Sequence, residues 1–279
     1  MTDFDTAWRE RFGDGVEHGA GPSGQEWSRI EGFLTHRSCR RFADRPVDEA
    51  LLEALLACAQ SAPSKSDLQQ YSIVVIDDPA LRGAMQTWAS FDEWIAKAPY
   101  FLVFCGDLRR QRRIAEMRGY DHRNDNLDTF MNTAVDAGIA LATFVAAAEA
   151  AGLGCCPISV VRNHIGEACD LLGLPDGVYP VAGLALGWPE QTAGVSMRLP
   201  PGAVVHRNRY RDDDLPALVA EYDTARHAVQ PIAPHKQRHP DKYGVAEVCH
   251  WSENTARQMS VPERAGFADF LRKRGFSLS

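Results

Sequence analysis

Apolar residues recur at helical spacing in two segments near the start of the chain. Within residues 26–35, Trp27, Ile30 and Phe33 lie on one face, which predicts an amphipathic helix. A second apolar stripe follows Asp48 and continues to about residue 60. Aspartate favours helix N-termini because its carboxylate accepts backbone N–H bonds, so Asp48 is predicted to cap this second helix.

Four short apolar runs have the length and composition of buried strands: residues 71–76, 100–105, 155–161 and 179–186. Between the second and third runs, residues 128–151 form a long alanine-rich helical pattern that is apolar on nearly every face. Such a helix is expected to be buried all round, in a core or at a subunit interface. Because helices and strands alternate unevenly, we expect an α+β fold with helices packed on a mixed sheet rather than a doubly wound parallel sheet.

The chain is predicted to have three parts. Residues 1–25 are rich in glycine and charge and indicate a flexible leader. Residues 26–189 carry most of the predicted elements, although the charged stretch 109–126 indicates a mobile loop or a frayed helix. Residues 190–279 are polar, contain many prolines and have scattered apolar anchors, which is typical of a segment that wraps around a folded body.

Composition narrows the class of protein. The chain has 45% hydrophobic and 24% charged residues, as in soluble globular proteins. Its net charge of −7 disfavours binding to nucleic acid or to an anionic membrane surface. No apolar run approaches the roughly 18 residues of a membrane helix, and the polar N-terminus does not resemble a secretory signal.

Seven cysteines, an odd number placed mostly in apolar segments, favour a reducing cytoplasm over a disulfide framework.

The most informative motif is the basic run His36–Phe42, which reads HRSCRRF. Arg37 and Arg40 are three residues apart around Ser38. Arginine offers a rigid fork of donors that stays charged at any working pH, and serine adds a hydroxyl donor. Such a set can hold a phosphate and a second anionic group, as flavin mononucleotide (FMN) requires. For these seven residues alone, a solvated basic loop is the alternative.

Two further stretches offer candidate ligand-binding side chains. The run Ser64–Ser66 clusters small hydroxyls and a lysine beside a predicted helix end, where they can donate to a ligand or satisfy their own backbone. Arg198 is followed by Pro200 and Pro201, which favour an extended segment. Taken alone, Arg198 is an ordinary surface arginine.

Other chemistries find little support. The chain has neither a GxGxxG run after a strand nor a phosphate-loop lysine motif. His235 and His239 have metal-ligand spacing, but the flanking prolines argue against a helix that presents both, so no metal is expected. The adjacent Cys155 and Cys156 are interpreted as alternating inward and outward strand residues rather than as a redox pair.

The order and spacing of several landmarks resemble the FMN-dependent nitroreductase superfamily, especially its oxygen-insensitive nitroreductase and NADPH–flavin oxidoreductase branch. The landmarks span roughly Leu34 to Phe276 and are HRSCRRF, APSKSDLQ, YFLVFCGD, EAAGLGCCPISVVRN, GLALGWP, MRLP, HWSENTARQM and RAGFADFLRKRGF. The resemblance implies a mixed, mainly antiparallel sheet flanked by helices, and a C-terminal segment that wraps the partner subunit. It also implies a homodimer with FMN at the interface.

The resemblance implies roles for twelve residues. Arg37 and Arg198 would meet the FMN phosphate, whereas Arg40 would meet the pyrimidine edge and stabilise the reduced flavin. Residues 64–66 would reach the flavin from the partner subunit, and residues 157–160 would pass beside the ring. The implied cofactor-binding residues are His36, Arg37, Ser38, Arg40, Ser64, Lys65, Ser66, Pro157, Ile158, Ser159, Val160 and Arg198.

Several positions depart from the pattern that the resemblance implies. Ser159 and Val160 are bulkier than the glycines usual there, and Ser196 replaces a lysine that would add a cation for the phosphate. Asp92 stands where a residue with a polar amide side chain is usual. Its carboxylate would disfavour the negative charge of the reduced flavin ring. Residues 227–248 are longer than expected and cover the region that should hold NADPH, which leaves the choice between NADPH and NADH open.

The resemblance implies an FMN-dependent oxidoreductase that takes hydride from NAD(P)H and passes it to a small aromatic acceptor in a ping-pong reaction. Nitroaromatics, quinones and flavins are the expected acceptors. No residue is assigned as a general acid or general base. The alternatives are a flavin-dependent dehalogenase, dehydrogenase or flavin-fragmenting enzyme on the same fold, or an FMN-binding protein with low turnover.

Overall fold

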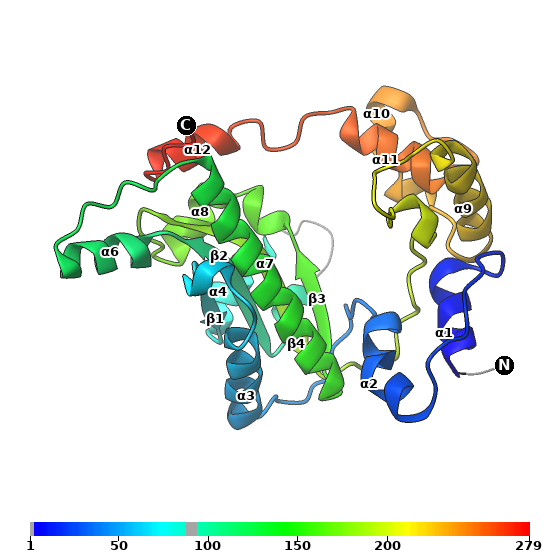
Figure 1. Cartoon of the computed structure of the whole chain (residues 1–279), viewed down its shortest axis with the longest axis horizontal. Coiled ribbons are helices and arrows are strands. Elements are labelled where there is room, and N and C mark those ends of the chain that lie inside the picture. The colour runs from blue at the N-terminus through cyan, green and yellow to red at the C-terminus, as the bar shows by residue number, and fades with distance from the viewer. Residues whose placement is uncertain (1–2, 88–93) are drawn as a thin grey trace. The chain divides into compact units, whose positions relative to one another are not determined.

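The chain divides into two compact units (Figure 1). A computed structural model describes residues 3–87 and 94–279. The helical unit consists of Met1–His36 and Gly194–Glu263, and the sheet unit of Arg37–Ala193 and Arg264–Ser279. The predicted division into a leader, a core and an extension stays a prediction.

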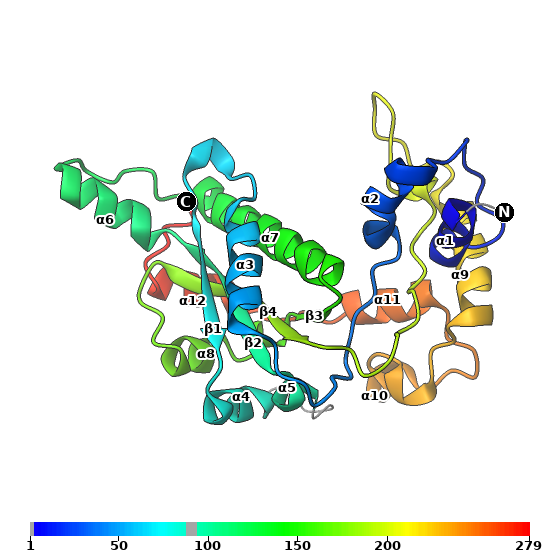
Figure 2. The same cartoon turned by 90° about the horizontal axis from the view of Figure 1, so that it is seen from below.

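The sheet unit is built on four antiparallel strands (Figure 2). They are β1 (Tyr71–Ile76), β2 (Tyr100–Asp107), β3 (Gly154–Ile158) and β4 (Val178–Gly187). Their order is β1-β2-β4-β3, so β2 and β4 are central and β3 lies at an edge. The four predicted strands and the α+β class are confirmed, but the third strand ends at Ile158, and residues 160–162 form a 3₁₀ turn where the strand was predicted to continue.

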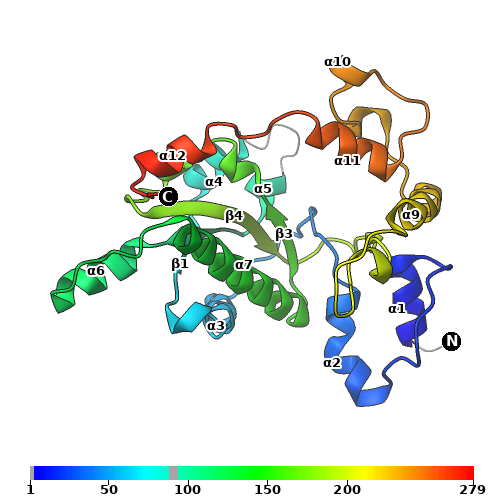
Figure 3. The ribbon, with the colours of Figure 1, turned by 45° about the horizontal axis from the view of Figure 1, so that its top comes forward.

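Helices cover both faces of this sheet, because its strands are apolar on both sides. One face packs against α3 (Glu49–Gln60) and α7 (Leu127–Ala150), as Figures 2 and 3 show. The other face packs against three short helices. These are α4 (Pro79–Gln86), α5 (Trp94–Lys97) and α8 (Ile165–Leu171).

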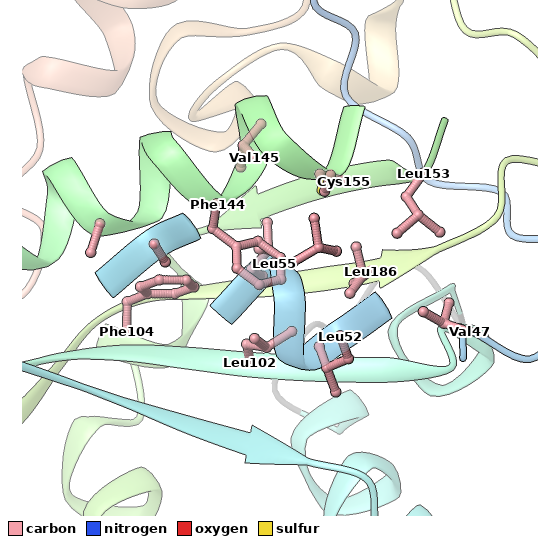
Figure 4. Close-up of a cluster of buried hydrophobic side chains, with 14 of the residues drawn as sticks. Val47, Leu52, Leu55, Leu102, Phe104, Phe144, Val145, Leu153, Cys155 and Leu186 are labelled. Carbon is pink, nitrogen blue, oxygen red and sulfur yellow. The ribbon is translucent and has the colours of Figure 1, made fainter. Parts of the chain in front are cut away.

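The larger core lies between α3, α7 and the sheet (Figure 4). Phe104 of β2 meets Phe144 of α7 in an edge-to-face contact with ring centroids 5.9 Å apart. Leu52 and Leu55 bring α3 onto the same cluster. Asp48 caps α3 as predicted, since its carboxylate accepts the N–H of the second residue of the helix at 2.9 Å.

The long helix α7 corrects one expectation. By length and composition it is apolar enough to cross a membrane, contrary to the expectation that no run approaches that length. Its contacts with β2 and α3 make it instead the core helix of the sheet unit. In the single chain its residues Leu127, Met131 and Val135 are 54%, 53% and 48% exposed, so for this face the expected burial at a subunit interface stays a prediction.

The C-terminal segment closes one end of the sheet unit. There α12 (Phe267–Lys273) joins a third cluster with Tyr179 and Phe276. The charged stretch after β2 forms the regular helix α6 (Arg109–Arg118), which ends at Gly119 with φ 72° in the left-handed region. Of the stretch 109–126, the first ten residues are therefore helical, whereas residues 119–126 are not in a helix.

The helical unit contains more helices than the sequence indicated. Its α-helices are α1 (Asp3–Phe12), α2 (Gly24–Leu34), α9 (Leu215–Val229), α10 (Pro240–Tyr243) and α11 (Trp251–Met259). The helix α1 lies inside residues 1–25, where a flexible leader was expected. The signal was present, because Phe4, Trp8 and Phe12 are four residues apart. Short 3₁₀ turns in the two units are Lys65–Asp67, Val160–Arg162, Pro201–Ala203 and Pro234–Lys236.

Candidate functional site

The twelve predicted site residues are distributed over both units. His36 and Arg198 belong to the helical unit, and the other ten belong to the sheet unit. Asp92 lies outside the described residues. Within the sheet unit, three stretches of chain carry the candidate side chains: the basic motif, the loop before β1 and the turn after β3.

The basic motif runs along the edge strand β3. Ser38 forms a parallel bridge with Cys155, and the Cys39 N–H donates to the Cys155 carbonyl at 2.8 Å. Further along, the Ala43 N–H donates to the Trp188 carbonyl at 2.9 Å. Main-chain hydrogen bonds therefore hold the motif against the ends of β3 and β4, which fixes the direction in which its arginines leave the backbone.

A glycine makes this close approach possible. A Cβ added to Gly154 would lie 2.6 Å from both Cβ and Sγ of Cys39, which is too close for any real contact. Burial raises the pKa of the Cys39 thiol, and the nearby charge of Arg40 only partly opposes this effect. Cys39 is thus a protonated packing residue that seats the motif.

The two arginines of the motif are free to meet a ligand. Arg37 is partly buried and Arg40 is exposed. In the range 3–87 and 94–279, neither guanidinium forms an ion pair or a hydrogen bond with another side chain or carbonyl. Cations that no carboxylate neutralises, held at a fixed edge of a sheet, fit an anionic group such as a phosphate.

The loop before β1 is held by a carboxylate that the sequence analysis missed. Asp136 of α7, only 1% exposed, accepts hydrogen bonds from Ser64 Oγ at 2.7 Å, Lys65 N at 3.0 Å and Gln70 N at 3.0 Å. The available signal was an aspartate inside an otherwise apolar helix. Because Ser64 Oγ also accepts from Gln69 N at 2.7 Å, this hydroxyl fixes the loop.

The backbone of this loop is strained. Ser66, Asp67 and Gln69 have φ values of 52°, 57° and 51°, in the left-handed region that residues other than glycine rarely adopt. Each such residue costs about 1–3 kcal/mol and persists only when its surroundings hold it. The side chains of Lys65 and Ser66 are exposed and form no hydrogen bond or ion pair inside the described ranges, so the loop presents them outward.

The turn after β3 is contacted by the C-terminal segment. Pro157 and Ser159 are exposed there, whereas Ile158 packs into the second core cluster. Arg264 donates through Nη2 to Ser159 Oγ at 3.3 Å and through Nε to Asn163 Oδ1 at 2.8 Å. Arg264 is a second site residue that the sequence analysis did not single out, because the contact joins positions 105 residues apart.

The cysteines of β3 are both interior residues. Cys155 and Cys156 are almost completely buried, so the prediction that one of them faces outward is wrong. The reason is that helices cover both faces of the sheet. Burial raises the pKa of the Cys155 thiol far above its usual range, which makes it a poor nucleophile. The described part of the chain contains no group of three His, Cys, Asp or Glu residues that could hold a metal ion.

Comparison with known proteins identifies the family to which this chain belongs. Residues 34–188 match the Nitroreductase family, and residues 196–279 match the Nitroreductase family, C-terminal domain. The chain therefore belongs to the nitroreductase family. The resemblance drawn from the sequence landmarks is confirmed, and so is the nitroreductase-like fold.

Individual relatives are similar over most of their length. An FMN reductase (NADPH) of Bacillus subtilis is 32% identical over 89% of this chain and 98% of its own. An oxygen-insensitive NADPH nitroreductase of Salmonella typhimurium is 34% identical, and the match covers 89% of this chain and 98% of the relative. Among solved structures, NfrA1 nitroreductase from B. subtilis superposes with a TM-score of 0.80 at 31% identity and covers 90% of this chain and 99% of that one. An NADPH:FMN oxidoreductase from Vibrio harveyi complexed with NAD⁺ gives a TM-score of 0.77 at 30% identity. This match covers 88% of this chain and 97% of that structure.

Proposed function

We propose that this protein is an FMN-dependent oxidoreductase that uses NAD(P)H to reduce small aromatic acceptors, such as nitroaromatics, quinones or flavins. The observation that carries the proposal is the pair Arg37 and Arg40. Both are held on β3 by the Ser38–Cys155 pairing, and neither has a partner among the described groups of the protein. The names of the relatives support the same reaction class.

In this proposal three arginines bind different parts of FMN. Arg37 and Arg198 bind the phosphate, and Arg40 lies at the pyrimidine edge of the ring. When bound, FMN accepts hydride from NAD(P)H and delivers it to the acceptor. Arg40 places a fixed positive charge where negative charge develops, and in a pocket that excludes water such a charge acts more strongly than in solvent.

Other stretches complete the proposed pocket. Residues 157–160 pass beside the ring, where backbone N–H groups face its N5 and O4 edge. His36 and Ser38 line the same cofactor. The exposed Lys65 and Ser66 reach the flavin of a second subunit, since the loop held by Asp136 presents them away from its own core.

The proposed assembly is a homodimer with FMN at the interface. Its support in the structure is the exposed stripe Leu127, Met131 and Val135 on α7. These residues are four apart and therefore lie on one face, where they form an apolar surface that a partner can cover. We further propose that residues 190–279 wrap the partner subunit and that the protein is cytoplasmic, in keeping with its seven free cysteines.

The spectrum of the purified protein tests this function. FMN added to the protein is expected to bind with a shifted absorbance band, to bleach with NADPH or NADH under anaerobic conditions, and to regain colour when a nitroaromatic or a quinone is added. A protein that leaves FMN unbound at micromolar concentration contradicts the proposal. Comparing the bleaching rates with the two nucleotides determines the preferred reductant.

A second candidate function is supported by the turn after β3. Ser159 and Val160 occupy positions where the family resemblance implied glycines, and Arg264 contacts the Ser159 hydroxyl. Such side chains beside the ring suit a flavin-dependent dehalogenase, dehydrogenase or flavin-fragmenting enzyme, or a low-turnover FMN carrier. Tight FMN binding without oxidation of either nucleotide in the presence of nitroaromatics and quinones would favour this second group.

A further inference from the structure

An arginine near the N-terminus joins two distant stretches of main chain. Arg11 lies in the last turn of α1 and is 5% exposed. Its guanidinium donates to three carbonyls: Nε to Leu34 at 2.9 Å, Nη2 to His36 at 2.7 Å and Nη1 to Ser196 at 2.6 Å. Leu34 and His36 lie three residues and one residue before Arg37, and Ser196 lies two residues before Arg198. Within the helical unit, one side chain thus joins the main chain at Leu34 and His36 to the segment that leads to Arg198.

The backbone at the end of α1 strengthens this junction. The Arg198 N–H donates to the Arg11 carbonyl at 2.8 Å, so Arg11 bonds the 196–198 segment through its side chain and its main chain. Gly13 ends the helix with φ 96°, and a Cβ added there would lie 3.1 Å from Cε of Met197. The turn after α1 therefore also packs closely on this segment.

Aromatic packing fixes the helix that carries Arg11. The rings of Phe4 and Trp27 meet edge to face with centroids 5.5 Å apart, which joins α1 to α2. Trp8 packs on His18 at 5.1 Å and donates through Nε1 to the Val16 carbonyl at 2.9 Å. The helix α1 is consequently a fixed support, although it precedes both ranges that match the nitroreductase family.

Residues 195 and 197 are also held by α9 and by the residue that follows it. Tyr222 donates from its hydroxyl to the Met197 carbonyl at 3.1 Å, and Gln230 donates through Nε2 to the Val195 carbonyl at 2.8 Å. The main chain before Arg198 is therefore bonded from two helices. An arginine on such a rigid base loses less freedom when it binds a phosphate than one on a loose segment does.

We propose that Arg11 is a positioning residue for the FMN phosphate: it fixes the backbone from which Arg198 extends. This inference rests on the proposed function. The chain has Ser196 where the family resemblance implied a lysine, so phosphate binding depends on fewer cations. Bidentate contacts between arginine and phosphate require well-placed guanidinium groups, which a fixed backbone supplies.

The test compares two ligands that differ only in the phosphate. Dissociation constants for FMN and for riboflavin are measured by flavin fluorescence with the full chain, using the wild type, Arg11→Met and Arg11→Lys. Arg11→Met is expected to weaken FMN binding about tenfold or more, equivalent to about 1.4 kcal/mol, and to leave riboflavin binding within about twofold. Arg11→Lys keeps the charge but cannot reach three divergent carbonyls, so an intermediate loss is expected.

Each outcome decides the proposal. Equal losses for FMN and riboflavin, or no loss for FMN in a folded Arg11→Met, would overturn it. If Arg11→Met fails to fold, Arg11→Lys decides, and wild-type affinity for FMN in that variant overturns the proposal. Failure of the proposed function is distinguishable, because the wild type would then bind neither flavin.

A double-mutant cycle adds a readout that a purely structural role would not move. In an Arg198→Gln background, Arg11→Lys is expected to weaken FMN binding less than in the wild type, because Arg11 acts partly through Arg198. Strict additivity of the two losses would contradict a positioning role through Arg198.

Discussion

The Ser64 hydroxyl donates to the buried carboxylate of Asp136 at 2.7 Å. This bond links a loop with three left-handed residues to the middle of the long core helix. Since Asp136 also accepts two backbone N–H groups of the same loop, one carboxylate determines the loop conformation. A surface loop that carries proposed cofactor ligands is thus anchored from inside the core.

Replacing Asp136 by Asn is expected to destabilise the protein by about 2–4 kcal/mol. The amide oxygen can accept fewer bonds, and the amide NH₂ faces donors, which leaves buried groups unpaired. Urea unfolding followed by circular dichroism measures the change. Asp128→Asn is the matched control, because Asp128 is exposed on the same helix; a loss as large in the control would contradict the role of Asp136.

Replacing Arg40 by Ala is expected to lower the reduction potential of bound FMN by about 20–60 mV. For a two-electron reduction, a change of about 30 mV corresponds to about 1.4 kcal/mol. The reason is the loss of a positive charge at the ring edge that becomes negative. Photoreduction with a reference dye gives the potential. The neighbouring Arg41→Ala is the control, and an equal potential in both variants would remove Arg40 from this role.

Gly154→Ala is expected to destabilise the sheet unit by about 2–4 kcal/mol and to weaken FMN binding. The added methyl would overlap Cys39, so the basic motif could not stay paired with β3. Thermal unfolding and FMN titration measure both effects. Gly166→Ala is the control, since a Cβ there meets nothing within 4 Å; in α8 it should be neutral or slightly stabilising.

A pH effect is expected from the contact between β2 and α3. Burial, followed by the hydrogen bond to Glu49, raises the pKa of Tyr100 to about 12; the hydroxyl lies 2.8 Å from Glu49 Oε2. The pKa of Tyr100 is higher in the folded protein than its value of about 10 in the unfolded chain. The protonated hydroxyl therefore stabilises the folded state fully below pH 10, and this stabilisation is lost as the pH rises towards 12. Tyr100→Phe should reduce the stability difference between pH 9 and pH 11.5 by about 1 kcal/mol, allowing for solvent screening. An unchanged pH profile in the variant would exclude this titration.

Met131→Glu is expected to weaken the proposed homodimer, because it places a charge in the centre of the apolar stripe on α7. Sedimentation velocity measures the association, and FMN affinity should fall with it if the partner supplies Lys65 and Ser66. Glu53→Lys on the exposed side of α3 is the control for a charge change. A variant that remains a dimer with normal FMN binding would show that this stripe is not the interface.

Local signals in the sequence predicted the framework well. The four strands, the Asp48 cap and the long helix followed from periodicity and capping, which depend on neighbouring residues. The residues that the sequence analysis missed act over long distances: Asp136 reaches back 72 residues to Ser64, and Arg264 reaches 105 residues to Ser159. No local pattern encodes which carbonyl or hydroxyl such a side chain will meet.

The misjudged burial of Cys156 has a related cause. Alternation predicts one inward and one outward residue only when one face of a sheet is exposed to solvent. Here β3 is covered on both faces, which depends on where α4, α5 and α8 pack. The helix α1 was missed for a different reason: glycine and charge dominate residues 1–25, and its aromatic spacing covers only three positions.

The junction at Arg11 has a consequence for how the chain matures on the ribosome. Its Ser196 acceptor lies 185 residues downstream, so at about 5–20 residues per second it emerges roughly 10–40 seconds after Arg11. The aromatic contacts of the first two helices can form early, while this last bond must wait for most of the polypeptide to be translated. The beginning of the protein is therefore among the last parts to be locked in place.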